Sequence, residues 1–253
     1  MAEDAGMLAR TMRVLGCFSE DEPAVTAAEI AARTGLPTST VHRLLADLVG
    51  HGLLARAPGH RYVVGPRLWE LGELSPLALR LRETVLPHMA RIYEDTGENV
   101  HLAVLDGPAP EASDALFVGR VTGSGSIPTL SRMGGRQPLH TTGVGKALLS
   151  TRDAAWLERY FEVPLERETL HSVTDPEVLR AELARARARG YATTREEMTL
   201  GNVSVAAPVA PVQGLPPIAI GLVVHLERAD ERRLAPLVVQ AARDLHADLR
   251  AAR

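Results

Sequence analysis

The first fifty residues carry apolar side chains at the spacing of short amphipathic helices. A first helix is predicted by Leu8, Thr11, Leu15 and Phe18. It is expected to end near the acidic run at residues 20–22. Thr26 and Glu29 have the spacing of a capping box, so a second helix is predicted to start there and to stop at Gly35.

A third helix is predicted from Pro37 to about Gly50, because proline suits the first turn of a helix. One stripe is apolar and consists of Val41, Leu44, Leu45, Leu48 and Val49. The opposite face carries Ser39, Thr40, Arg43 and Asp47, flanked by His42. Residues 53–56 and 61–64 are short β-prone runs around a Pro-Gly turn, which predicts a hairpin.

The remainder of the chain mixes strand and helix patterns after a leucine-rich helical connector and a helix around residues 85–95. Strands are predicted at residues 100–105, 115–121, 203–209 and 218–224. Helices are predicted at residues 141–150, 153–160 and 174–189, and a long amphipathic helix ends the chain. The pattern predicts an α+β architecture with a small helical unit, a connector and a larger α+β domain.

Composition limits the classes of function. The chain has 253 residues, 45% of them hydrophobic, so it can bury a core. Its single cysteine, Cys17, fits a reducing compartment, and neither a membrane-length apolar run nor a signal peptide is seen, so a cytoplasmic protein is expected. The net charge of −3 argues against a protein that coats nucleic acid, so DNA binding requires a local arrangement.

Such an arrangement lies around Gly35. Ala31 precedes this glycine by four residues, as a helix-turn-helix requires where its two helices cross closely. In the following helix, Thr38, Ser39 and Thr40 are short hydroxyl residues that let the helix end approach a phosphate. Arg43 can pair with a guanine edge, and His42 can reach a base or a phosphate.

The hairpin adds a second possible contact with DNA. Arg56 and Arg61 flank its tip, where a cationic wing can enter the minor groove. Residues 23–65 hold four arginines against two acidic residues. The alternative is that the helices and hairpin serve only packing or dimerisation, because a fold does not dictate a function.

The second half lacks the marks of catalysis. Gly143, Gly145 and Lys146 fail the phosphate-loop pattern, which needs another glycine upstream and a hydroxyl residue after the lysine. Two interpretations stay open: the backbone amides at this helix start hold a ligand carboxylate or carbonyl, or the glycines only permit close packing. The histidines have no metal-ligand spacing, and no serine nucleophile motif is present.

The sequence resembles the IclR-type transcriptional regulators over nearly its whole length. The resemblance is carried by residues 36–45, Gly52, Tyr62, residues 65–68, residues 96–105, residues 138–147 and residues 189–191. It implies a winged helix-turn-helix domain (1–66), a helical linker (67–83) and a GAF-like α/β effector-binding and oligomerisation domain (84–253). It also implies dimers, often paired into tetramers, on pseudo-palindromic double-stranded operators. Thr38 replaces a lysine common in the family, which removes one phosphate contact.

The resemblance also implies an effector pocket. Its residues are Thr129, Gly143, Val144, Thr194, Ser204, Gly221 and Val223. Thr194 stands where the family usually has an acid, Ser204 where it often has cysteine, and Gly221 and Val223 where it can have serine. Our hypothesis is therefore a less polar or bulkier effector than a very small keto acid, with organic and aromatic acids as candidates. A calorimetric screen that finds binding only to ligands of pyruvate size would refute it.

The sequence thus predicts a ligand-responsive DNA-binding regulator, repressor or activator, without a metal or other cofactor. The alternative is a small-molecule enzyme with an N-terminal winged-helix interaction module. It would need a converging acid–base or nucleophile set, which the sequence does not supply.

Overall fold

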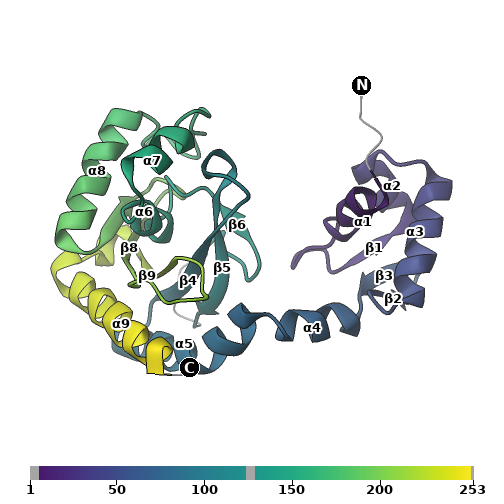
Figure 1. The fold of residues 1–253 in the computed structure, drawn as a ribbon, viewed down its shortest axis with the longest axis horizontal. Helices are drawn as coiled ribbons and strands as arrows, with labels where there is room; N and C mark the ends of the chain where they lie inside the picture. Colours follow the sequence, from purple (N-terminus) through teal and green to yellow (C-terminus); the bar gives the residue numbers. More distant parts are fainter. Residues whose placement is uncertain (1–5, 124–128, 252–253) are drawn as a thin grey trace. The chain divides into compact units, whose positions relative to one another are not determined.

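The structure is a computed structural model that describes residues 6–123 and 129–251 (Figure 1). The chain divides into two compact units, residues 1–78 and 79–253, called here the N-terminal and C-terminal units. Helix α5 (Pro76–Thr96) runs across this division and across residue 84, the predicted start of the effector-binding domain.

The N-terminal unit contains helices around a small sheet. Its elements are α1 (Met7–Leu15), β1 (Ala24–Thr26), α2 (Ala27–Thr34), α3 (Thr38–Gly50), β2 (Leu54–Ala57), β3 (Arg61–Val64) and α4 (Pro66–Glu73). The predicted capping box is confirmed, since the Glu29 amide donates to the Thr26 hydroxyl and the Thr26 amide to the Glu29 carboxylate. Gly35 ends α2 in the left-handed region, with φ 66°.

Three details differ from the prediction. Helix α1 ends at Leu15, before the acidic run, with Gly16 as its C-cap. Pro37 is the N-cap of α3 rather than its first residue. Strand β1, which three residues form, pairs with β3 and has no alternating pattern long enough to be recognised in the sequence.

The C-terminal unit is built on an antiparallel sheet whose strand order is β6-β5-β4-β9-β8-β7. The strands are β4 (Asn99–Asp106), β5 (Asp114–Val121), β6 (Arg136–Gln137), β7 (Ala192–Arg195), β8 (Asn202–Pro208) and β9 (Ile218–His225). The helices are α6 (Gly143–Leu149), α7 (Ala154–Tyr160), α8 (Pro176–Arg189) and α9 (Glu231–Ala251), with 3-10 turns at Pro110–Ala112 and Leu226–Arg228.

Helices cover both faces of this sheet (Figure 1). On one face, side chains of α6, α7 and α8 form a core with Ala103 and Phe117 of the sheet. On the other face, α9 packs on β8 and β9. Helix α5 lies against that face too, since a Cβ atom at Gly119 would meet the Met89 sulfur at 3.0 Å. The predicted α+β fold class is confirmed, while the short strands β6 and β7 were missed.

Candidate nucleic-acid interface and ligand pocket

Helix α3 presents its predicted polar face to solvent. Val41, Leu44, Leu45 and Leu48 are buried against the rest of the N-terminal unit. Because that stripe faces inward, Thr38, Ser39, His42 and Arg43 are exposed, and Thr40 is half-buried. The residues predicted to contact DNA from this helix therefore share one accessible face.

The structure separates the four arginines of residues 23–65 by their contacts. Arg33 donates to the Glu22 carboxylate and to the carbonyl of Cys17, and Arg61 donates to the Ala24 carbonyl at 2.6 Å. These two side chains hold the fold together. Arg43, by contrast, has no hydrogen bond or ion pair with any residue that the structure describes, so its guanidinium is available to a partner.

The hairpin has the predicted turn. Gly59 and His60 take positive φ angles of 74° and 57°, which close a three-residue loop between β2 and β3. Arg56 is exposed and its guanidinium carbon lies 5.9 Å from the centre of the Tyr62 ring, on the paired strand. Arg56 is thus the freer of the two predicted wing arginines.

All seven residues predicted for the effector pocket line one cavity in the C-terminal unit. The cavity has about 520 Å³ of space not filled by atoms, part of it open to solvent. The predicted residues are Thr129, Gly143, Val144, Thr194, Ser204, Gly221 and Val223. Strand pairing brings three of these residues together, because Thr194 pairs with Ser204 and Ser204 pairs with Val223 across three neighbouring strands.

A small hydroxyl cluster lies at one side of this pocket. The Gly143 amide donates to Ser204 Oγ at 3.1 Å, and the hydroxyls of Ser204 and Thr194 bond to each other at 2.6 Å. Two hydroxyls carry two protons, and their mutual bond uses one. The second proton has no acceptor among the described residues, so the cluster keeps one donor for a ligand.

The two glycines of α6 are required for close packing. A Cβ atom at Gly143 would lie 2.5 Å from Ser204 Oγ, and one at Gly145 would lie 2.3 Å from the Leu139 carbonyl oxygen. Their amides are also occupied, by Ser204 Oγ and Thr142 Oγ1. Of the amides at this helix start, that of Val144 donates to no described residue.

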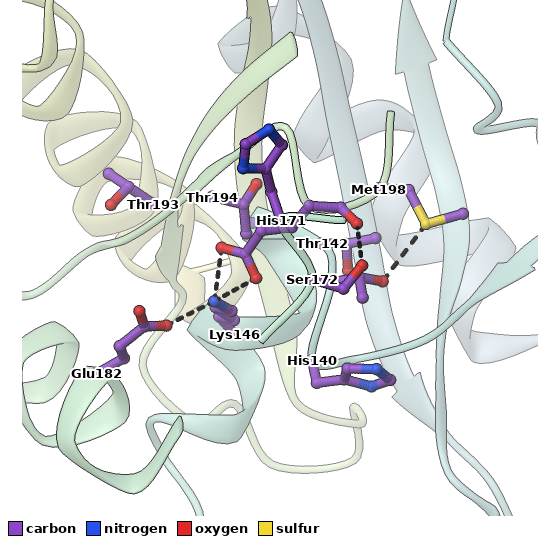
Figure 2. A network of polar contacts seen from close by, with 12 residues as sticks. His140, Thr142, Lys146, His171, Ser172, Glu182, Thr193, Thr194 and Met198 are labelled. Carbon is purple, nitrogen blue, oxygen red and sulfur yellow. Dashed lines mark hydrogen bonds and ion pairs between the residues drawn. The ribbon is translucent and has the colours of Figure 1, made fainter. Parts of the chain in front are cut away.

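Lys146 forms a buried ion-pair network beside the pocket. Its ammonium group lies 2.6 Å from Glu182 and 2.7 Å from Glu197, and its side chain is only 2% exposed. Figure 2 shows Lys146 with Glu182 of α8 on one side and Thr142 and Met198, both pocket residues, on the other. Burial raises the pKa of Glu197, and the neighbouring Lys146 charge opposes that rise.

The prediction missed one side of the pocket, where His101, Phe117 and Ser131 lie. His101 is buried, packs edge-on to the Phe117 ring and bonds through Nε2 to Ser131 Oγ at 2.8 Å. Burial, and then the Arg120 charge, lower the pKa of His101 to about 3, so the imidazole is neutral near pH 7. A polar residue in the apolar run at 100–105 was the available signal.

Among the described residues, no group of three or more histidine, cysteine or acidic side chains is placed to hold a metal ion. None of their helices is long and apolar enough to cross a membrane.

Models of known protein families match both the N-terminal and the C-terminal part of the chain. The family model for the IclR helix-turn-helix domain matches residues 7–58, and the model for the bacterial transcriptional regulator IclR C-terminal domain matches residues 77–248. The transcriptional regulator BhcR of Paracoccus denitrificans is 33% identical over 96% of this chain and 88% of its own. The Pca regulon regulatory protein of Pseudomonas putida is 30% identical over 94% of this chain and 82% of its own.

A solved structure is similar throughout. It is that of an IclR homolog complexed with 4-hydroxybenzoate from Microbacterium hydrocarbonoxydans, with a TM-score of 0.88 and 36% identity over 97% of this chain and 99% of that chain. The fold and these comparisons thus define a ligand-responsive DNA-binding transcriptional regulator rather than an enzyme. The chain belongs to the IclR family of bacterial transcriptional regulators.

Proposed function

We propose that α3 and the β2–β3 wing recognise a pseudo-palindromic operator in double-stranded DNA. Thr38, Ser39 and Thr40 contact phosphates, and Arg43 reads a base edge with His42 beside it. Arg56 and Arg61 approach the minor groove from the wing, Arg56 with the freer side chain. The observation that carries this proposal is Arg43, exposed and without a partner among the described residues.

We propose that the protein works as a homodimer, two of which associate as a dimer of dimers. The support is apolar surface on the N-terminal unit, where large side chains are 45–75% exposed. They are Met7, Leu8 and Met12 of α1 and Trp69 and Leu71 of α4, together with Leu74. Exposed apolar surface larger than that of single scattered side chains marks protein–protein interaction sites. Light scattering on the purified chain tests this, and a monomer at micromolar concentration contradicts it.

We propose an aromatic carboxylic acid as the effector of the C-terminal pocket. The hydroxyl cluster of Thr194 and Ser204 and the Val144 amide supply donors for a carboxylate, while Phe117, Val144 and Val223 supply apolar walls. The bound 4-hydroxybenzoate of the similar solved structure supports this class. Lys146 pairs with Glu197, which lines the pocket, and so reduces the repulsion that this carboxylate exerts on an anion.

The test is fluorescence anisotropy with labelled DNA from upstream of the protein's own gene, with and without 4-hydroxybenzoate. We expect specific binding that changes several-fold with the acid, because effectors shift affinity by about 1–3 kcal/mol. Pyruvate is the control for a very small keto acid. If the protein binds upstream and scrambled DNA equally well, the operator proposal is contradicted. If only pyruvate changes the binding, the proposed effector class is contradicted.

We also propose that the chain has three parts with boundaries at 1–66, 67–83 and 84–253. The protein acts in the cytoplasm, where bacterial chromosomal DNA lies.

A further inference from the structure

The pocket has a second polar group, centred on His101, that is separate from the donors proposed for the effector carboxylate. His101 Nε2 lies 2.8 Å from Ser131 Oγ, and the Ser131 hydroxyl donates to Thr129 Oγ1 at 3.0 Å. All three residues line the pocket. They come from β4 and from the chain before β6, away from the hydroxyl cluster on β7 and β8.

The hydrogen bonds fix which imidazole nitrogen carries the proton. A serine has one hydroxyl proton, and Ser131 uses it toward Thr129. Ser131 Oγ must therefore accept from His101 Nε2, which carries the N–H. In a neutral imidazole the other nitrogen, Nδ1, is then a lone-pair acceptor. No described residue bonds to that nitrogen.

The two polar groups stand far enough apart for a ring to lie between them. His101 pairs with Gly221 on β9, and Gly221 pairs with Ala206 on β8, two residues from Ser204. Two strand spacings across and two residues along place the α-carbons of His101 and Ser204 about 12 Å apart. The residues between them on the sheet, Gly221 and Ala206, carry at most a methyl group and both line the pocket, and Phe117 stands at the edge of His101.

We infer that His101 Nδ1 accepts a hydrogen bond from a hydroxyl group of the effector, at the end of the ring opposite the carboxylate. The inference rests on the aromatic-acid effector of the proposed function and narrows it to hydroxylated aromatic acids. The pocket then has a donor end at Thr194 and Ser204 and an acceptor end at His101. A carboxylate at the acceptor end has no proton to donate to Nδ1, so it cannot replace the hydroxyl group in this hydrogen bond.

The test is calorimetric titration of the full chain with 4-hydroxybenzoate, benzoate and terephthalate. We expect 4-hydroxybenzoate to bind about tenfold more tightly than benzoate, the effect of one hydrogen bond in a buried site. Terephthalate is expected to bind more weakly than 4-hydroxybenzoate, because its second carboxylate has no proton to donate to Nδ1. Equal affinity for 4-hydroxybenzoate and benzoate overturns the inference and leaves the proposed effector class intact. Binding of none of the three overturns the proposed effector class, and the inference with it.

Variants at His101 and Ser131 test whether these residues cause the preference for 4-hydroxybenzoate over benzoate. His101→Phe keeps a ring but removes the hydrogen-bond acceptor. This variant should therefore bind 4-hydroxybenzoate and benzoate equally, both with the affinity that the wild type has for benzoate. His101→Asn keeps an acceptor oxygen near the place of Nδ1 and should retain most of the preference. Ser131→Ala leaves the imidazole in place but removes the acceptor that keeps the proton on Nε2, so either nitrogen can then carry it. The preference for 4-hydroxybenzoate over benzoate should fall to an intermediate value. Ser131→Ala serves as the test if His101→Phe does not fold. A preference unchanged in both His101→Phe and Ser131→Ala overturns the inference.

Discussion

The two units present their functional residues in opposite ways. In the N-terminal unit, Arg43 and His42 are exposed and have no partners among the described residues, while the buried side of α3 holds the fold. In the C-terminal unit, Thr194 and His101 are buried and already hydrogen-bonded. DNA supplies its own dense array of partners, whereas a small ligand needs donors and acceptors fixed beforehand. A substitution of a functional residue should therefore change binding without changing stability in the N-terminal unit, whereas it should change both in the C-terminal unit.

The largest expected effect is on the C-terminal unit, from Lys146→Met. It leaves the Glu197 carboxylate, 7% exposed, without its cation, and breaking a buried pair in this way costs about 3–5 kcal/mol of unfolding free energy. Urea unfolding followed by Trp156 fluorescence in a Trp69→Phe background measures it, since the chain has two tryptophans. Adding Glu197→Gln should restore part of the loss. A loss below about 1 kcal/mol would mean that the pair does not hold the unit together.

In the N-terminal unit, Arg43→Ala should weaken operator binding by about 1–3 kcal/mol and relax specificity at one base position. Its stability should not change, because no described residue bonds to Arg43. Anisotropy titrations with operator and scrambled DNA measure both effects. Arg243→Ala, an exposed arginine on α9, changes the charge equally and is expected to leave binding unchanged. Equal losses in the two variants would point to general electrostatics rather than base reading.

The pH dependence of stability should reveal His101. Its pKa is lowered to about 3 in the folded chain, so between pH 6.5 and 3 the unfolded chain binds one more proton. The stability that His101 contributes is therefore present above pH 6.5 and is lost as pH falls. From pH 7 to pH 5 the loss is about 2 kcal/mol. Urea unfolding of the wild type and of His101→Asn at pH 7 and pH 5 isolates the contribution of His101, because all other groups titrate in both proteins. The prediction is contradicted if the unfolding free energies of the two proteins change by the same amount between these pH values.

The smallest predicted effect is that of a helix cap. Thr26→Ala removes the side chain that caps α2 and should lower the unfolding free energy by about 1 kcal/mol. Thr38→Ala is the matched control, because Thr38 is exposed and α3 begins without a side-chain cap. Thermal unfolding monitored by circular dichroism measures both. If Thr26→Ala and Thr38→Ala lower the unfolding free energy equally, the capping side chain of Thr26 stabilises the unit no more than an exposed threonine does.

Local patterns made the N-terminal unit predictable from sequence. The capping box at Thr26, the left-handed Gly35 and the apolar stripe of α3 each depend on residues within a few positions of one another. Strand β1 was missed because its pairing with β3 is set by contacts across about forty residues of chain rather than by its own three residues.

The pocket was harder to predict. The seven residues predicted for the effector pocket followed from the family resemblance. His101 and Ser131 belong to the pocket only through strand register and a contact across 30 positions. Burial decides the protonation state of His101, and burial cannot be read from a single strand pattern. The sequence likewise left two interpretations of the helix start at α6 open. The tight contacts of Gly143 and Gly145 show that these glycines permit close packing, and the Val144 amide still has no acceptor among the described residues.

The buried Lys146 gives the chain an internal chemical reporter. It is the only lysine, it lies in the C-terminal unit, and the only cysteine, Cys17, is buried in the N-terminal unit. An amine-directed reagent can modify the ε-amino group only when the α6–α8 contact opens, and a thiol reagent reaches Cys17 only when the helical core opens. Labelling rates followed by mass spectrometry would therefore time the opening of each unit separately within one unmodified chain.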